Sequence, residues 1–185
     1  CKHWSWDRIL RSCYIKQADV VLAFYYFPHR FTQQQKRTNF DFYEPMTVHE
    51  SSLSPSMYSV VASASGRYQE AYRLYQRAAR LDLDNFNADT EDGLHITSMA
   101  GSWLAVVQGF AGLNYHGEHL AFTPRCPEAW RRVSFRILYR GRLLAVSFDS
   151  AQFCLDILEG DALTVEVDGK AYCCEQSISV PVSND

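Results

Sequence analysis

The 185-residue sequence lacks an apolar run that approaches the roughly 20 residues of a membrane-spanning helix. Its first residues, CKHWSWDRIL, contain neither an apolar signal core nor an initiator Met, so we expect a piece from the interior of a longer protein. An excess of basic residues is also missing, because the formal net charge is −3. These absences predict that neither a membrane nor a nucleic acid is a partner.

Cysteine is present six times but never in a CxxC pair, and no Cys/His cluster has the spacing of a zinc site. Cys173 and Cys174 are adjacent, so on a strand their side chains would face opposite sides. The sequence also lacks an N-glycosylation triplet and any nucleotide or pyridoxal motif. We therefore expect reduced thiols, a cytoplasmic location, no metal and no organic cofactor.

What the sequence does contain is a globular composition, with 47% hydrophobic and 21% charged residues. Residues 1–112 read as helices joined by short connections, which favours antiparallel helical hairpins. Thr32 is the predicted N-cap of one helix, Pro55 suits the first turn of the next, and Gly66 its end.

After Gly112 the apolar period changes to two, which indicates short strands. Turn residues separate them, and Asp168-Gly169 has the composition of a tight hairpin turn. Residues 113–185 are therefore predicted to form a small antiparallel β domain. The predicted fold class is α+β, with the helices first and the sheet second.

Three polar stretches of the helical part could carry chemistry. In the first, IKQADV, Lys16 and Gln17 are expected at the start of a buried helix. A charged donor beside an amide suits sugar hydroxyls, although a solvated lysine at a helix end would look the same.

The second stretch, VHESSLSPS, places Glu50 among several hydroxyls. Ser52 or Ser54 could cap the helix that follows. A carboxylate in this position can bind sugar hydroxyls or act as a base, or it can be a solvated residue beside a cap.

The third stretch, TEDGLHITSMAGS, opens an apolar helix with small residues. Backbone N–H groups at such a helix end suit a phosphate, and His95, Thr97 and Ser98 could complete its binding site. Close helix packing through Gly101 is the alternative, and the two roles can coexist.

Taken together, HWSWDRILRSCYIKQADVV, NFDFYEPMTVHESSLSPS and ARLDLDNFNADTEDGLHITSMAGSW resemble the disaccharide phosphorylases of glycoside hydrolase family 65, over residues 3–160. Within the family, the chain most resembles members that act on maltose. The resemblance implies that residues 1–112 are the last helices of an (α/α)6 barrel and residues 113–185 a C-terminal β domain. The missing N-terminal part of the enzyme would be a partner, and a homodimer stays open.

The activity that this resemblance implies is inverting phosphorolysis, in which maltose and inorganic phosphate give β-D-glucose 1-phosphate and D-glucose. It places Lys16 and Gln17 on the glucosyl hydroxyls, Glu50 on the sugar and phosphate side, and His95, Thr97 and Ser98 around phosphate. The family's general acid would precede residue 1, so the isolated chain is expected to be inactive. Kojibiose, nigerose or trehalose as substrate, hydrolysis with Glu50 as base, and a non-catalytic carbohydrate-binding module are the alternatives.

Overall fold

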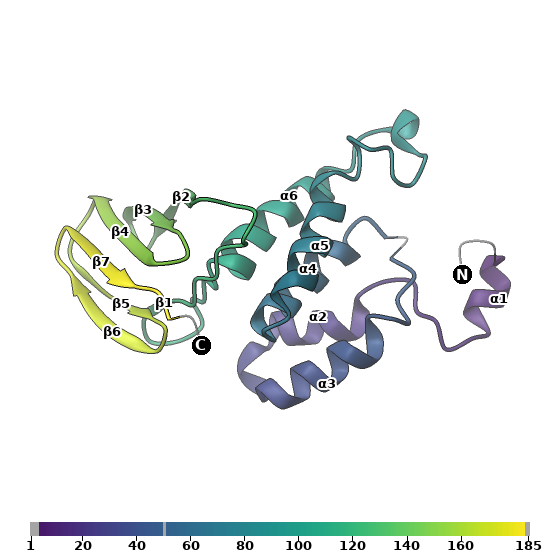
Figure 1. Cartoon of the computed structure of the whole chain (residues 1–185), viewed down its shortest axis with the longest axis horizontal. Coiled ribbons are helices and arrows are strands. Elements are labelled where there is room, and N and C mark those ends of the chain that lie inside the picture. Colours follow the sequence, from purple (N-terminus) through teal and green to yellow (C-terminus); the bar gives the residue numbers. More distant parts are fainter. Residues whose placement is uncertain (1–3, 50, 184–185) are drawn as a thin grey trace. The chain divides into compact units, whose positions relative to one another are not determined.

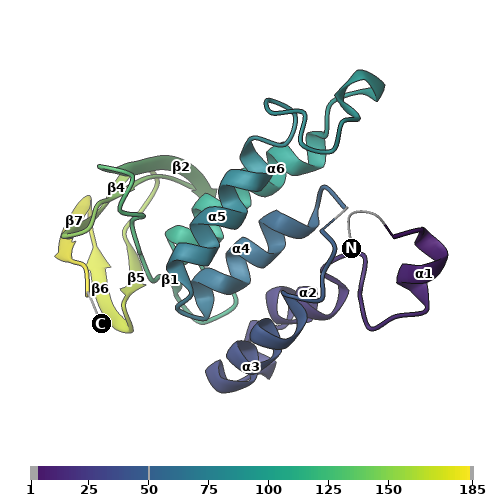
Figure 2. The same cartoon turned by 45° about the vertical axis from the view of Figure 1, so that its right-hand side comes forward.

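The computed structural model describes residues 4–49 and 51–183, and all structural statements below concern these residues. They form two compact units, which we call the helical unit, Cys1–Ala105, and the β unit, Val106–Asp185. Figures 1 and 2 show the elements of each unit. The predicted division into helices followed by strands is confirmed.

The helical unit contains six α-helices and two short 3-10 helices in its described residues. They are α1 (Trp6–Leu10), α2 (Asp19–Tyr26), η1 (Pro28–Arg30), α3 (Gln33–Tyr43), α4 (Ser54–Ala64), α5 (Tyr68–Ala79), η2 (Thr90–Asp92) and α6 (Ile96–Leu104). A π-helical segment, η3 (Ala105–Phe110), follows α6 and crosses into the β unit.

Helix α4 is the centre of the helical unit, and its residues Ser54 to Ser63 are all buried. It packs against α2, α3, α5 and α6, and both views show it with α5 on one side and α2 on the other (Figures 1 and 2). Serine and alanine dominate its sequence, so neighbouring backbones can approach closely. The buried Ser59 hydroxyl donates to the Ala71 carbonyl of α5 over 2.7 Å.

Several helix boundaries follow the predicted signals. Thr32 caps α3 in a capping box with Gln35, Pro55 lies in the first turn of α4, and Gly66 follows the end of α4 with φ +76°. The predicted serine cap of α4 is wrong. Its N-cap is Leu53, and the Ser54 hydroxyl instead accepts a hydrogen bond from the backbone N–H of Ala18.

The β unit contains two sheets. Their strands are β1 (Leu120–Phe122), β2 (Val133–Tyr139), β3 (Arg142–Phe148), β4 (Gln152–Glu159), β5 (Leu163–Val167), β6 (Lys170–Cys174) and β7 (Ser177–Pro181). One sheet has the order β1-β5-β6 and the other β2-β3-β4-β7. The pairing is antiparallel as predicted, except that β1 and β5 run parallel.

The core of the β unit comes from alternating inward residues, including Val146 of β3, Leu155 of β4 and Val165 of β5. Phe122 and Phe153 join the two sheets with ring centroids 4.9 Å apart. Asp168-Gly169 forms the β5–β6 turn, with positive φ at both residues, as the sequence predicts.

The predicted boundary between the helical domain and the β domain, at residues 112/113, falls between η3 and β1. Within the described residues, no helix has the length and apolarity of a membrane span.

Candidate functional site

Residues from all three polar stretches line one cavity of the helical unit, which has a volume of about 350 Å³. Gln17 comes from the first stretch, Ser51 from the second and Thr97 from the third. Apolar and aromatic residues complete the wall, together with Ser54 and Gly101; they are Ala18, Leu22, Tyr25, Tyr26, Leu53, Met57, Ala100 and Leu104. Segments that are about 80 residues apart in the sequence therefore meet at one concave site, which is typical of ligand binding.

Backbone hydrogen bonds fix the first stretch against the second. Ile15 donates to the carbonyl of Met46 over 3.0 Å, and Val48 donates to the carbonyl of Ile15 over 2.9 Å. The buried bond from the Ala18 N–H to the Ser54 hydroxyl, 3.1 Å long, adds a third tie. These contacts hold Gln17 at the cavity wall.

Lys16 and Gln17 do not start a helix, because α2 begins at Asp19. The pairing of Ile15 with Thr47 keeps the preceding backbone extended, and the prediction of a helical position is wrong. The Gln17 amide donates to the Asp19 carboxylate over 3.0 Å. The exposed Lys16 ammonium lies 4.9 Å from the ring centroid of Trp6, a cation–π contact outside the described cavity lining.

The second stretch supplies Ser51, whereas Glu50 lies outside the described residues. His49 precedes it with a positive φ of 55° and is only 6% exposed. Its ring packs edge-on against Tyr58, with centroids 4.9 Å apart, and its carbonyl accepts from Arg77 over 3.0 Å. His49 therefore anchors the loop from the protein interior.

The Glu44 carboxylate lies behind this loop, next to His49. Glu44 lies 3.7 Å from the His49 ring nitrogen Nε2 and 2.9 Å from the Arg73 guanidinium. The interaction with His49, and after it Arg73, holds the pKa of the Glu44 carboxyl below its ordinary value, although burial opposes this. Nearby, burial raises the pKa of the Tyr58 hydroxyl to about 12, and that hydroxyl shares a 2.6 Å hydrogen bond with Thr47.

The third stretch divides between the cavity and the helix packing. Thr97 is exposed and lines the cavity, on the first turn of α6. Ser98 is buried, and its hydroxyl donates to the Ala78 carbonyl of α5 over 3.0 Å. Gly101 lies against Ser56 of α4 so closely that a Cβ there would overlap the serine side chain.

His95 is the N-cap of α6, but its ring is engaged within the protein. Its Nδ1 lies 2.6 Å from Asp82 and its Nε2 lies 3.5 Å from Asp89. The hydrogen bond to Asp82, and then the charges of both carboxylates, raise the pKa of the imidazole, so its charged form is favoured.

The cavity also contains residues that sequence reasoning did not select. Tyr25 and Tyr26 lie on α2, and their adjacency in an apolar run gave no reason to separate them from core. Ser51 was visible only as one of several serines. Among the described lining residues there is no Asp, Glu or His.

Comparison with known sequences defines the family. The profile of the glycosyl hydrolase family 65 central catalytic domain matches residues 1–104, and that of the family's C-terminal domain matches residues 113–173. The chain belongs to glycosyl hydrolase family 65.

Relatives in family 65 include the maltose phosphorylase of Bacillus subtilis (strain 168), which is 54% identical over 166 residues. That alignment covers 90% of this chain and 22% of the relative. The alpha,alpha-trehalose phosphorylase of Thermoanaerobacter brockii is 39% identical over 163 residues, which cover 88% of this chain and 21% of the relative. The chain thus spans about a fifth of the length of these relatives.

A solved structure from the human microbiome, described provisionally as a kojibiose phosphorylase, superposes with a TM-score of 0.93 at 36% identity. It is matched by the whole of this chain, which covers 27% of it. The helical unit and the β unit are therefore parts of a larger family 65 architecture.

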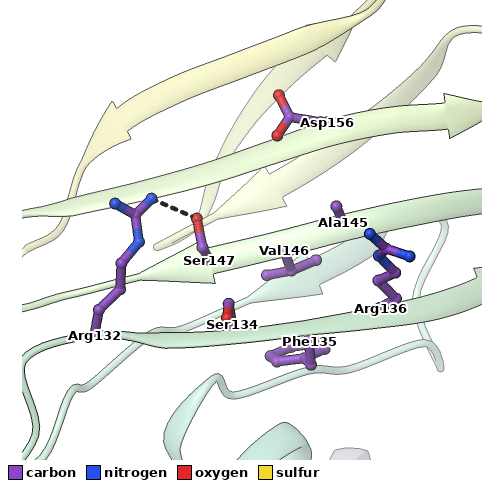
Figure 3. A pocket seen from close by; sticks show the side chains of 8 residues that line it. All are labelled: Arg132, Ser134, Phe135, Arg136, Ala145, Val146, Ser147 and Asp156. Carbon is purple, nitrogen blue, oxygen red and sulfur yellow. Dashed lines mark hydrogen bonds between the residues drawn. The ribbon is translucent and has the colours of Figure 1, made fainter.

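The family 65 C-terminal part has a hollow of its own, on the strands β2, β3 and β4 (Figure 3). Arg132 reaches over the sheet and donates to the Ser147 hydroxyl over 2.7 Å, while Arg136 and Asp156 stand on β2 and β4 (Figure 3). None of the residues predicted for sugar or phosphate lines this hollow.

Proposed function

We propose that this chain is part of an inverting disaccharide phosphorylase that cleaves maltose with inorganic phosphate. The products are β-D-glucose 1-phosphate and D-glucose. The observation that carries the proposal is the meeting of Gln17, Ser51 and Thr97 at one cavity of a family 65 catalytic domain. The 54% identity to a maltose phosphorylase, against 39% to a trehalose phosphorylase, favours maltose as the substrate.

The chemistry explains why such a cavity needs amides and hydroxyls. An inverting glycosidase uses a carboxylic acid on the leaving oxygen and a second carboxylate to activate water. A phosphorylase replaces that water with phosphate, which is already an anionic nucleophile. Catalysis then depends on holding phosphate and the glucosyl carbon in line, and positioning of this kind lowers the barrier substantially.

Each side chain has a proposed task. Gln17 can both donate to and accept from glucosyl hydroxyls, and Lys16 would add a charged donor once it leaves Trp6. Thr97 stands at the N-terminal turn of α6, where N–H groups and the helix dipole favour an anion. We also keep His95 and Ser98 in the proposed phosphate site, and we keep Glu50 as a proposed residue on the sugar and phosphate side of the cavity.

Several parts of the proposal concern the complete enzyme. The general acid is proposed to come from the polypeptide that precedes residue 1 in the relatives, so the isolated chain should not turn over. Inorganic phosphate is the cosubstrate, no organic cofactor is required, and the cytoplasm is the proposed location.

Calorimetric titration of the chain tests the binding part of the proposal. Glucose should bind more tightly with phosphate present, because Thr97, which belongs to the proposed phosphate site, lines the same cavity as Gln17. Gln17→Ala should weaken glucose binding by about tenfold, the loss of one or two hydrogen bonds, while Ser52→Ala, outside the lining, should not. Glucose binding that ignores phosphate would indicate a non-catalytic carbohydrate-binding module instead.

A further inference from the structure

His95 lies between two carboxylates that hold it differently. Asp82 makes two contacts with this residue. Its Oδ2 accepts a hydrogen bond from the His95 backbone N–H over 2.8 Å, and its Oδ1 lies 2.6 Å from the ring nitrogen Nδ1. Asp89 approaches the opposite ring nitrogen, Nε2, at 3.5 Å, which is longer than a good hydrogen bond.

Asp82, which makes the shorter contact with His95, is also the more buried of the two carboxylates. The Asp82 side chain is 10% exposed and fixed by its two contacts with His95. Asp89 is 39% exposed and stands in the loop between α5 and α6, directly after Ala88, whose φ of +57° is unusual for alanine. Asp82 is therefore the more buried partner of His95, held by two contacts, and Asp89 is the more exposed partner, held by one long contact.

We propose that Asp82 is a positioning residue that holds His95 as a charged donor, and that Asp89 occupies at Nε2 the place of a substrate oxyanion. This inference rests on the proposed function, because it takes the oxyanion to be inorganic phosphate. Arriving phosphate displaces the Asp89 carboxylate and accepts the hydrogen bond from Nε2, while Asp82 keeps its contact with Nδ1. No covalent bond changes in this exchange.

The negative charges around the His95 ring agree with these different roles of Asp82 and Asp89. Among residues 4–49 and 51–183, the charged groups that face the ring are Asp82, from the segment after α5, and Asp89, from the loop before α6. The hydrogen bond to Asp82 is the largest cause of the raised pKa of His95, so Asp82 does most to keep the ring charged. Since phosphate is an anion, a charged imidazole binds it better than a neutral one.

Two equal changes of charge should then have opposite effects on anion binding. At pH 7.5, Asp89→Asn should tighten phosphate binding by about threefold, because a competing anion is removed, whereas Asp82→Asn should weaken it by up to about tenfold, because the ring loses the carboxylate that favours its charged form. Asp84→Asn is the matched control, because Asp84 is close in sequence but pairs with Arg80.

Sulfate serves as a second probe, because its charge does not change between pH 5 and 8. At pH 5.5 the imidazole is protonated with or without Asp82, since its ordinary pKa is about 6.5. The defect of Asp82→Asn should therefore disappear at pH 5.5 and return at pH 7.5. A merely structural loss would persist at both pH values.

Proton titration of the His95 ring by NMR judges the role of Asp82 without any ligand. The pKa of His95 should fall in Asp82→Asn and fall less in Asp89→Asn, because the hydrogen bond to Asp82 is the largest cause of the raised pKa. An unchanged pKa in Asp82→Asn, or weaker anion binding in Asp89→Asn, would overturn the inference. Because this titration needs no phosphate, it remains decisive for Asp82 even where the phosphorylase proposal fails.

Discussion

At the scale of single residues, the site depends on small side chains whose contacts are not visible in the sequence. Ser54 was expected to cap its own helix, yet its hydroxyl binds Ala18, 36 residues earlier in the chain. Ser98 was expected at phosphate, and its hydroxyl donates to α5. A serine hydroxyl bonds equally well to near and distant partners, so the sequence could select these residues but not their partners.

Ser54→Ala should destabilise the helical unit by about 1–3 kcal/mol, because the buried Ala18 N–H loses the Ser54 hydroxyl as its acceptor. Urea denaturation at neutral pH measures the change. Ser52→Ala is the control and should lie within about 0.5 kcal/mol of wild type. Equal stability of the two variants would show that the Ala18 N–H finds another partner.

Gly101→Ala should destabilise the chain by about 1–3 kcal/mol, because the added methyl group overlaps Ser56. Gly117→Ala is the matched control, since the nearest atom to its added methyl group is the His119 carbonyl oxygen at 3.8 Å. A wild-type melting temperature for Gly101→Ala would contradict the observed approach of α6 to α4.

Glu44 should make stability depend on pH. Because its pKa is lowered in the folded chain, its contribution is present above the ordinary pKa of 4.5 and is lost as pH falls through the folded value. Glu44→Gln should thus be less stable than wild type at pH 7, with a difference that shrinks below pH 4.5. Denaturation midpoints at a series of pH values test this, with the exposed Glu128→Gln as control.

At the scale of elements, residues typical of helix ends and turns were sufficient to predict boundaries that depend on neighbouring residues alone. Thr32, Pro55 and Gly66 marked helix ends correctly, and Asp168-Gly169 marked its hairpin. The start of α2 was missed, because the strand-like pairing of Ile15 with Thr47 is a tertiary contact. The parallel pairing of β1 with β5 likewise joins segments too distant for a sequence pattern to reveal.

The β5–β6 turn is an element whose strength can be measured. Asp168 accepts from Arg125 and from the Ser183 N–H, each over 3.0 Å, so it ties the turn to two other segments. Asp168→Ala should lower stability by about 1–3 kcal/mol and speed amide exchange in β5 and β6. Asp161→Ala, in an exposed turn, should change neither; unchanged exchange in Asp168→Ala would show that the turn holds without these bonds.

At the scale of the whole molecule, the family assignment rests on both units, since separate family 65 domains match residues 1–104 and 113–173. The sequence predicted this architecture and three stretches of a candidate site. From these stretches the structure brings Gln17, Ser51 and Thr97 to one cavity. It could not predict that His95 is paired with Asp82, because a loop folds back to make that contact.

A chimaera tests the central claim most directly: this chain replaces the corresponding residues of the Bacillus subtilis maltose phosphorylase, and glucose 1-phosphate formed from maltose is measured. We predict turnover that requires phosphate, falls at least about tenfold in Gln17→Ala and in Thr97→Val, and is unchanged in Ser52→Ala. The 185-residue chain alone should give only background. Turnover without phosphate, or full activity in both cavity variants, would contradict a sugar and phosphate site in this cavity.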